Sequence, residues 1–505
     1  MADWFRSSSV IVPISEDELL GEGEENNNNV APVDEIPFCA RRSSVICRNG
    51  CVASSQPLAS SIGIDLLKQG ANAAEAAIAV SAALCVTEPC SCGLGGDMFC
   101  LYYDAKTQKV SAINGSGHSP SKLTLDLVRN DYPSKNKKSN DATNDNNNNN
   151  SNNNGGEGEE ECDIDVDEFR FSPHAVTVPG AARGYEDLLM KHGSGNFTLS
   201  ELLEPAAKLA EEGFPVAPIT SYHWTNGMDQ IKKWLSDEDD DNIPLTTDGC
   251  NPPKAGDIII NTDLANVLRE LGTKGAADGF YGGYPGQAIV DVIQKHGGVM
   301  TLEDLKEQTC TFPDPICVDY CDIKLWQVPP NGQGIAGLIA LKGLGYLQEE
   351  NCPVVPGTAD CYHSMIEMMR LGFADARAHV ADIDHMNVSC DALLNTDRIE
   401  KRVDELFNPE KATIAGMPDP SSCTVSFQVV DKAGNAISFV NSNYMGFGTG
   451  MVPKNCGFTL QNRGFGFNLE KGHPNVIAPR KRPVSLLFYV MVLNPSSLFL
   501  HVIIS

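Results

Sequence analysis

The stretch Thr424-Val-Ser-Phe-Gln-Val-Val-Asp-Lys-Ala-Gly-Asn-Ala-Ile-Ser-Phe-Val-Asn441 has the pattern of a β-hairpin. In residues 425–429, apolar and polar side chains alternate, which is typical of a strand with one buried face. Residues 431–435 include a glycine and an asparagine, which favour the positive φ of a tight turn, and residues 437–439 resume the alternation. The pattern predicts two antiparallel strands, with Thr424 at the start of the first.

The flanking sequence mixes helix and strand signals. Helix N-termini are predicted where a capping side chain is followed three residues later by an acid, because such a pair satisfies two backbone N–H groups. These pairs are Asn72 with Glu75, Thr198 with Glu201, and Thr301 with Asp304. An amphipathic helix is predicted over residues 363–378, and buried strands over residues 99–103 and 175–178. The mixture predicts an α+β fold.

The composition is that of a globular protein with a strong acidic excess. Hydrophobic residues make up 42% of the 505 residues and charged residues 21%. The net charge of −28 argues against affinity for nucleic acid or for anionic membranes. Many of the acids fall in three polar segments, 15–37, 133–168 and 237–241, which we interpret as solvated loops.

Cysteine usage and the N-terminus bear on cofactors and location. The seventeen cysteines are too few for a disulfide scaffold, and their spacing does not match a zinc ribbon or finger. We therefore expect no structural metal, and no motif predicts a cofactor. The N-terminus lacks the apolar core of a secretory signal, and we find no membrane anchor, so a cytoplasmic setting with free thiols is expected.

Seven motifs along the chain carry a resemblance to a known family. They are Val52–Ser60 continuing through Gly70–Ala77 to Thr87-Glu-Pro89, Gly93-Leu-Gly-Gly-Asp-Met-Phe99, Thr177-Val-Pro-Gly-Ala181, Gly297-Gly-Val-Met-Thr-Leu-Glu-Asp-Leu305, Pro329-Pro-Asn-Gly-Gln-Gly334, Phe373-Ala-Asp-Ala-Arg377, and Thr424 with Val429-Val-Asp-Lys-Ala-Gly-Asn435. Each is weak alone, but their order and spacing together are specific. From about Asn49 to Pro483 the chain resembles the γ-glutamyltranspeptidase family, in its transpeptidase-like branch.

The resemblance implies a fold and a processing event. The fold is that of the N-terminal-nucleophile hydrolases, a four-layer αββα sandwich with two stacked sheets between helix layers. The precursor cleaves itself, here between Cys423 and Thr424, into a large and a small subunit. The expected regions are a disordered acidic tail at 1–42, a large-subunit region at 43–423 with a low-complexity insertion at 134–168, and a small-subunit region at 424–505.

The family register implies that Thr424 is the nucleophile. In the family the nucleophile stands seven residues before the Asp of a Val-Val-Asp-x-x-Gly-Asn run, which here is Asp431. The chemistry is compatible, because a Thr hydroxyl needs an adjacent base, and the α-amino group freed by cleavage has a pKa of about 8. One residue can thus supply nucleophile and base. Residues 418–423, a loose stretch with Pro and Ser, predict an accessible approach to the cleaved bond.

The resemblance also places further residues at substrate-contacting positions. His118 lies in the run that replaces the family's Arg-Glu-x-Ala-Pro, where Ser116 takes the place of the carboxylate-binding Arg. Ser442 occupies the place of a second Thr beside the nucleophile. Tyr444 occupies that of a substrate-contacting Asn, and Asn443 is one position away.

Arg463 and Ser485 complete the set of expected substrate-binding residues. Arg463 takes the place of a Gln, and Gly466 that of the acid that holds the α-amino group of a γ-glutamyl donor, so this pocket favours a carboxylate over an ammonium. Ser485 fits the stretch after the Lys-Arg-Pro element, but the family's glycine pair, which supplies oxyanion donors, does not follow. We therefore expect a truncated C-terminal part, with final strands missing and residues 486–493 available at an unpaired sheet edge.

Sequence and resemblance together predict an autoprocessing acyltransferase and hydrolase. The expected donor is a γ-glutamyl or γ-glutamyl-like amide of the glutathione type, the intermediate a Thr acyl-enzyme, and the acceptor water, an amine or a peptide. Two alternatives stay open: a glutaryl-type amidase, favoured by the missing acid at Gly466, and an inactive family member with a binding or regulatory role, favoured by the missing oxyanion glycines. The expected partners are the substrate and the two fragments of one precursor, without nucleic acid or a membrane anchor.

Overall fold

The computed structural model of the chain describes residues 45–134, 164–235, 243–321, 323–349, 355, 357–412, 423–485, 490–493 and 500–501. The predicted tail at 1–42, most of the predicted insertion and residues 418–422 of the predicted approach lie outside these residues, whereas Cys423 lies in a strand. Within them, no helix combines the length and apolar character needed to cross a bilayer.

The predicted hairpin is confirmed, and it forms the centre of a five-stranded antiparallel sheet. Strands β8 (Cys423–Val430) and β9 (Ala436–Tyr444) pair with each other. The order across the sheet is β1 (Cys51–Ala53), β8, β9, β2 (Asp97–Asp104) and β3 (Lys109–Gly115). The strand predicted at 99–103 is therefore also confirmed, as part of β2.

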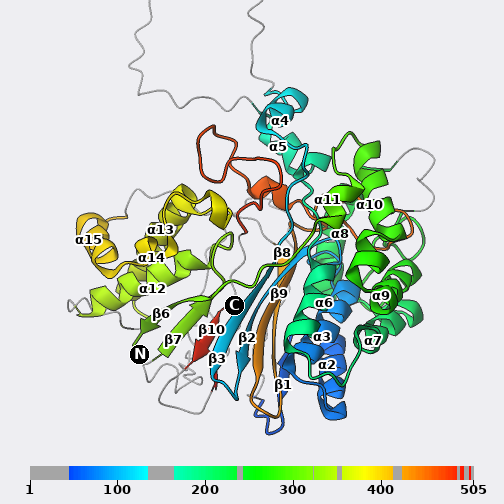
Figure 1. Cartoon of the computed structure of the whole chain (residues 1–505), viewed down its shortest axis with the longest axis horizontal. Helices are drawn as coiled ribbons and strands as arrows, with labels where there is room; N and C mark the ends of the chain where they lie inside the picture. The colour runs from blue at the N-terminus through cyan, green and yellow to red at the C-terminus, as the bar shows by residue number, and fades with distance from the viewer. Residues whose placement is uncertain are drawn as a thin grey trace, which may run out of the picture.

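Helices α2 (Pro57–Gln69), α3 (Ala73–Thr87) and α6 (Ala181–His192) pack against this first sheet (Figure 1). Every residue of α3 is buried, because its many alanines allow close approach to β8 and β9. The predicted capping box is present: Asn72 Oδ1 accepts the Glu75 N–H, and the Glu75 carboxylate accepts the Asn72 N–H. The boxes predicted at Thr198 and Thr301 are confirmed as well, at the start of α7 (Leu199–Glu212) and α11 (Leu302–Lys306).

A second sheet has the order β11 (Leu500–His501), β10 (Met491–Leu493), β7 (Ile323–Gln327), β6 (Ile316–Tyr320). Helix α12 (Gly334–Glu349) packs on it, and α13 (Ala359–His379) and α15 (Thr396–Leu406) pack on α12. Helix α13 confirms the helix predicted at 363–378. These elements bury an apolar core of their own.

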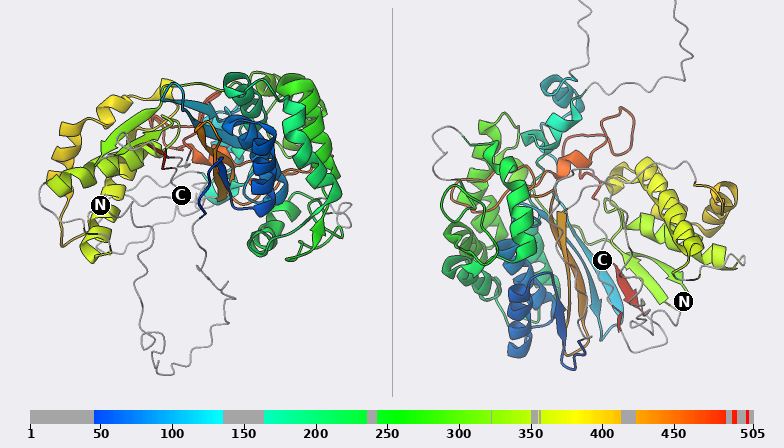
Figure 2. Two further views of the ribbon diagram at one scale, coloured as in Figure 1. Left: turned by 90° about the horizontal axis from the view of Figure 1, so that it is seen from below. Right: turned by 180° about the vertical axis from the view of Figure 1, so that it is seen from behind.

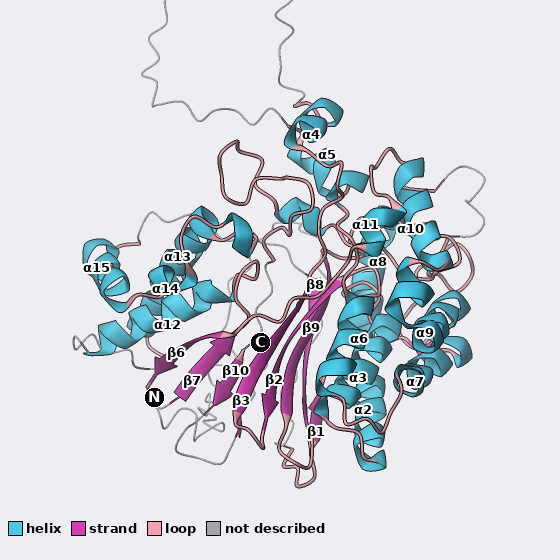
Figure 3. Ribbon diagram, in the orientation of Figure 1, coloured by secondary structure: helices cyan, strands magenta, loops and turns pink. Residues whose placement is uncertain are grey.

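The two sheets face each other, and each carries helices on its other face (Figures 2 and 3). Phe99, Leu101 and Val440 from the first sheet are buried in one cluster with Val328 and Met491, which lie next to or within the second. The mixed helix-and-sheet architecture expected from the sequence is thus present. The remaining α-helices and strands are α4 (Leu125–Asp131), α5 (Val166–Arg170), α8 (Pro218–Lys232), α9 (Thr262–Gly275), α10 (Tyr284–Lys295), α14 (Cys390–Leu393), β4 (Phe214–Pro215) and β5 (Ile258–Ile259).

Two local predictions are wrong. Residues 175–178 are buried but form no strand: a 3₁₀ turn spans Pro173–Ala175, and the Val178 N–H donates to the His118 carbonyl instead of a strand ladder. The insertion predicted to extend through Glu168 ends earlier. Ile164 pairs with Pro133 and is buried, and α5 begins at Val166, because Ile164 and Phe169 have apolar neighbours to pack against.

The expectation for the C-terminal part also needs correction. Residues 491–493 were expected at an unpaired edge of the sheet that presents Thr424, but they form β10, which pairs with β7 in the second sheet. The edges of the first sheet are β1 and β3. Met491 and Val492 are buried, so burial of these apolar side chains accounts for the placement.

Candidate active site around Thr424

Thr424 lies at an irregularity in the pairing of β8 with β9. Cys423 pairs with Tyr444 on one side of it, and Val425 pairs with Asn441 on the other. Two residues of β9 therefore lie opposite the single residue Thr424. Such bulges redirect side chains and are frequent beside active sites.

The Thr424 hydroxyl is hydrogen-bonded to the Ser442 hydroxyl, with 3.0 Å between the two Oγ atoms. The Tyr444 backbone N–H donates to the same Ser442 Oγ at 2.8 Å. Because Ser442 Oγ accepts this N–H, its own proton can be donated to Thr424 Oγ1. Tyr444 has a φ of 77°, a conformation that costs energy in a residue other than glycine and is concentrated at functional sites.

Arg463 contacts Ser442 and Tyr444, the two residues that surround the Thr424 hydroxyl. It begins the short 3₁₀ helix Arg463–Gly466 and is fully buried. Its Nη2 donates to the Ser442 carbonyl oxygen at 3.4 Å, and its guanidinium carbon lies 4.8 Å from the centroid of the Tyr444 ring. Its Nε lies 3.6 Å from Oδ2 of Asp97, which is fully buried too.

Asp97 connects Arg463 to the loop that carries His118. Its Oδ1 accepts the Gly117 backbone N–H at 3.0 Å and the Gln461 Nε2–H at 2.8 Å. Burial raises the pKa of the Asp97 carboxyl, and the Arg463 guanidinium and the hydrogen bonds to the carboxyl oppose that shift. With donors on one oxygen and a cation beside the other, these surroundings are suited to the ionised form.

His118 is neutral in this setting at pH 7. Burial, and next the charge of Arg482, lower the pKa of its ring to about 4, against the opposing effect of Asp382. A neutral imidazole can donate one hydrogen bond to a substrate carboxylate but offers it no charge. Arg482 lies in the same network: its Nε donates to the Ser116 carbonyl at 3.0 Å and its backbone N–H to Asp382 Oδ2 at 2.9 Å.

Ser485 lies in the same hydrogen-bond network as Ser116 and Arg482. Its N–H donates to the Asn331 carbonyl at 2.8 Å, and Asn331 Nδ2 donates to Ser116 Oγ at 3.0 Å and to the Pro483 carbonyl at 2.7 Å. The Ser485 hydroxyl is buried and has no hydrogen-bond partner among the described residues. It is therefore an uncommitted polar group next to the Ser116 network.

Asn443 and Gly466 complete the predicted positions. Asn443 is buried, and its Nδ2 makes long hydrogen bonds to the Pro89 carbonyl (3.3 Å) and Thr459 Oγ1 (3.4 Å). A Cβ atom added at Gly466 would lie 2.5 Å from the Val484 carbonyl oxygen. The backbone would have to move before an acid could stand at Gly466.

The structure thus brings four predicted site residues into direct contact: Thr424, Ser442, Tyr444 and Arg463. His118 and Ser485 lie in the adjoining network instead. Sequence reasoning missed Asp97, Asn331 and Arg482 as members of these networks. Asp97 and Asn331 stand within motifs that carry the family resemblance, and Arg482 stands in the Lys-Arg-Pro element, so these motifs were the available signal. Nothing in the sequence shows that Asp97 contacts residue 463.

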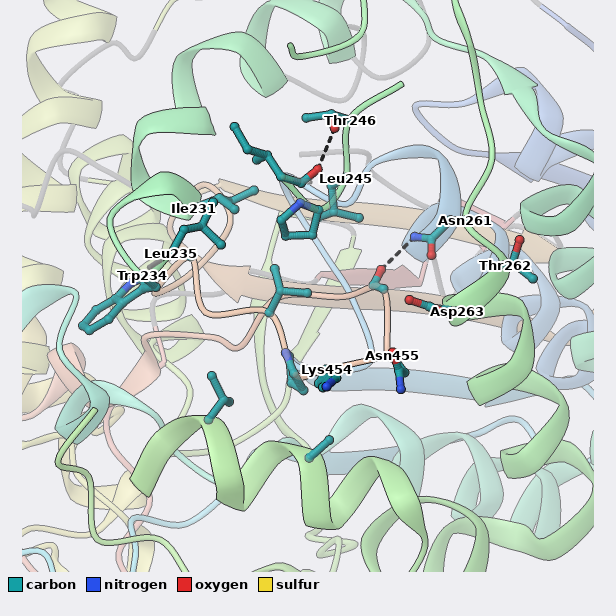
Figure 4. Close-up of a pocket in the computed structure, with 18 of the residues that line it drawn as sticks. Ile231, Trp234, Leu235, Leu245, Thr246, Asn261, Thr262, Asp263, Lys454 and Asn455 are labelled. Atoms are coloured by element: carbon teal, nitrogen blue, oxygen red, sulfur yellow. Dashed lines mark hydrogen bonds between the residues drawn. The ribbon is translucent and has the colours of Figure 1, made fainter. Parts of the chain in front are cut away.

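A cavity of about 1030 Å³ lies elsewhere, among α8, α9, α10 and the segment 450–457 (Figure 4). Its wall includes Trp234, Asn261, Asp263 and Lys454, and Asn261 Nδ2 donates to the Gly457 carbonyl at 2.8 Å. None of the described candidate residues lines it. Across the part of the chain that the structure describes, no group of three or more His, Cys, Asp or Glu side chains is placed to hold a metal ion, and no disulfide is formed.

Comparison with known proteins places the chain in a family. The family model of Gamma-glutamyltranspeptidase matches residues 59–145 and 159–502. The Glutathione hydrolase-like YwrD proenzyme of Bacillus subtilis (strain 168) is 30% identical over 459 residues, which cover 89% of this chain and 77% of that protein. The Glutathione hydrolase proenzyme of the same organism is 30% identical over 460 residues, covering 87% of this chain and 72% of that protein.

A solved structure has the same fold. The cephalosporin acylase from Bacillus halodurans superposes with a TM-score of 0.76 at 32% sequence identity, covering 92% of this chain and 79% of that one. The seven motifs, the fold built around the β8–β9 hairpin and these matches agree. The chain belongs to the γ-glutamyltranspeptidase family of enzymes.

Proposed function

We propose that the protein is an autoprocessing acyltransferase and hydrolase that uses Thr424 as its N-terminal nucleophile and takes γ-glutamyl or γ-glutamyl-like amides of the glutathione type as donors. The observation that carries the proposal is the placement of Thr424 at a bulge, with its hydroxyl 3.0 Å from that of Ser442. Membership of the family supports the same reading. Its relatives include proteins named as proenzymes of glutathione hydrolases.

The first step in this proposal is cleavage of the chain. Thr424 Oγ1 attacks the carbonyl carbon of Cys423, the peptide nitrogen takes the proton, and the acyl group moves from nitrogen to oxygen as an ester. Water then hydrolyses the ester, leaving a carboxylate on Cys423 and an amino group on Thr424. The proposed large and small subunits are residues 1–423 and 424–505, and we propose that they remain packed in a four-layer αββα sandwich.

The second stage is acyl transfer. The freed α-amino group, with a pKa of about 8, accepts the hydroxyl proton as Thr424 attacks the donor amide. The amine leaves with a proton, and water or an acceptor amine resolves the ester. We propose that Ser442 donates a hydrogen bond to Thr424 Oγ1, and that His118, Asn443, Tyr444 and Ser485 contribute to the surrounding substrate site.

A glutaryl-type amide is the second candidate donor, and Gly466 favours it. The position has no carboxylate for an α-ammonium, and the Val484 carbonyl leaves no room for one. A glutaryl group lacks this ammonium, so it leaves no cation in need of a partner. The two candidates share one mechanism and differ only in the acyl group.

Thr424→Ala separates the proposal from its non-enzymatic alternative. The wild-type chain should resolve into two fragments on a denaturing gel and hydrolyse a γ-glutamyl anilide, whereas Thr424→Ala should stay a single inactive chain. Ser426→Ala, which removes a hydroxyl two residues further along β8, is the matched control and should cleave normally. A folded wild-type chain that stays whole and inactive would support a binding or regulatory role instead.

A further inference from the structure

Asp97 and Arg463 form a buried ion pair. The pair contacts both the Ser442–Tyr444 segment beside Thr424 and the Gly117–His118 loop. Both side chains are fully buried, and the distance from Arg463 Nε to Asp97 Oδ2 is 3.6 Å. A buried pair of this kind offsets its desolvation only when further polar contacts complete it. The position of those contacts therefore indicates what the pair is placed to hold.

The arginine side of the pair holds β9 next to the nucleophile. Arg463 donates to the Ser442 carbonyl at 3.4 Å and lies over the Tyr444 ring at 4.8 Å. Ser442 carries the hydroxyl bonded to Thr424 Oγ1, and Tyr444 donates the N–H that orients this hydroxyl. Arg463 thus contacts both residues that fix the hydrogen bond to Thr424.

The aspartate side of the pair holds the loop of His118. Asp97 Oδ1 accepts the Gly117 N–H at 3.0 Å, and Gln461 Nε2 bridges Asp97 Oδ1 (2.8 Å) to Thr177 Oγ1 (3.0 Å). A Cβ atom at Gly117 would lie within 3.0 Å of the Val178 carbonyl, so the loop backbone is closely packed at this point. The Asp97 carboxylate therefore joins the loop to Gln461 and, through Arg463, to β9.

We propose that Asp97 and Arg463 act together as positioning residues, which fix the Ser442–Tyr444 segment and the Gly117–His118 loop relative to Thr424. The inference rests on the proposed function of Thr424 and gives Arg463 a role different from binding a substrate carboxylate. Full burial of the guanidinium against Asp97, the Ser442 carbonyl and the Tyr444 ring favours positioning over substrate contact.

Positioning and substrate binding by Arg463 predict effects on different kinetic parameters. If Arg463 positions the site, Arg463→Gln should slow self-cleavage and lower kcat by about 10²-fold, the cost of small misplacements of reacting groups, with KM changed much less. If it binds the substrate, KM should rise while self-cleavage proceeds normally. The double variant Asp97→Asn/Arg463→Gln should lose less than the product of the two single losses, because it leaves no unpaired buried charge.

Amide hydrogen exchange on the full chain gives a readout that needs no activity. Arg463→Gln should speed exchange in residues 115–120 and 440–446, because the Ser442 carbonyl loses its donor and Asp97, which accepts the Gly117 N–H, loses the cation beside it. Asp375→Asn is the matched control. Asp375 is a buried carboxylate of α13 that pairs with Arg398 (2.6 Å) and Arg402 (3.3 Å) of α15, away from the site, and its loss should alter exchange in α13 and α15 alone. If Arg463→Gln fails to fold, Arg463→Lys carries the test, because it keeps the charge and loses the planar fork.

The outcomes are separable. A raised KM with normal kcat, or unchanged kcat, cleavage and exchange, would overturn the positioning role. A wild-type chain that neither cleaves nor turns over would overturn the proposed function, and the exchange data would still decide whether the ion pair holds the two segments.

Discussion

The hydroxyls of Ser442 and Thr424 share one hydrogen bond, so substitutions at Ser442 test that bond without removing the nucleophile. Ser442→Ala should lower both the rate of self-cleavage and kcat by about 10- to 100-fold, because the hydroxyl that orients and solvates Thr424 Oγ1 is lost. Ser442→Thr should retain most activity, since it keeps the hydroxyl. Single-turnover kinetics and a time course on denaturing gels provide the measurement.

Ser438→Ala is a fitting control for Ser442→Ala, because Ser438 is an equally buried serine on the same strand, away from Thr424. Its rates should match those of the wild type. Equal rates for Ser442→Ala and the wild type would show that Ser442 plays no part in either reaction.

Gly466 leads to a prediction about which acyl donor the enzyme prefers. With no carboxylate at this position, the α-ammonium of a γ-glutamyl donor has lost its family partner, so glutaryl and γ-glutamyl amides of one leaving group should have kcat/KM values within about tenfold of each other. Gly466→Asp should not create a γ-glutamyl preference, because the Val484 carbonyl blocks the new side chain. A wild-type preference of about 100-fold for the γ-glutamyl amide would mean that another acid binds the amine.

The hairpin depends on the turn that joins β8 to β9, and Asp431 is central to that turn. Its Oδ1 accepts the N–H groups of Ala433 and Asn435, and its Oδ2 accepts the Ala73 N–H at the start of α3. Asp431→Ala should lower the free energy of unfolding by about 2–4 kcal/mol, because it removes charge-assisted bonds from a buried carboxylate that joins two elements. Urea denaturation measures the loss.

Asp104→Ala provides the comparison for this element. Asp104 also accepts two turn N–H groups, from Lys106 and Thr107, but these hydrogen bonds are exposed and both lie within one turn. Its loss should stay below about 1 kcal/mol. Equal losses for the two variants would contradict a special role of Asp431 in fastening the hairpin to α3.

Elements with a complete local signal were predictable from the sequence. The alternation in residues 425–429 and the pairing of Asn72 with Glu75 specify a strand and a helix start by themselves. Residues 175–178 had the apolar composition of a strand, but the partner of the Val178 N–H is the His118 carbonyl, which local composition cannot reveal. Local patterns therefore predicted elements but not the tertiary partners of irregular segments.

At the scale of the whole molecule, two half-buried histidines predict how stability depends on pH. Burial lowers the pKa of both His118 and His192 to about 4, below the usual value of 6.5. Between these values the unfolded chain binds protons that the folded chain does not, so stability should fall as the pH decreases from about 6.5 to about 4. Replacing both residues by Gln should flatten this part of the curve, measured by urea denaturation at several pH values.

The exposed residue His223 provides the control for this prediction. His223→Gln should leave the slope unchanged, because its side chain meets solvent in both states. A slope that persists in the His118→Gln/His192→Gln variant would assign the effect to other groups.

Contacts between distant parts of the chain account for what the sequence did not reveal. The contact between Asp97 and Arg463 joins residues far apart in sequence, and family position alone had assigned Arg463 to the substrate. The segment 491–493 was expected at a free edge, whereas burial of Met491 and Val492 places it in the second sheet. Both depend on which surfaces meet after folding, a property that local patterns do not encode.

N-terminal sequencing of the small fragment addresses the role of Thr424 with one experiment. The purified full chain should separate on a denaturing gel into two fragments, and the smaller should begin Thr424-Val-Ser-Phe, with a free α-amino group on the proposed nucleophile. The Thr424→Ala chain, purified in the same way, should remain whole. A small fragment that begins at any other residue, or equal cleavage of the Thr424→Ala chain, would contradict the assignment of Thr424.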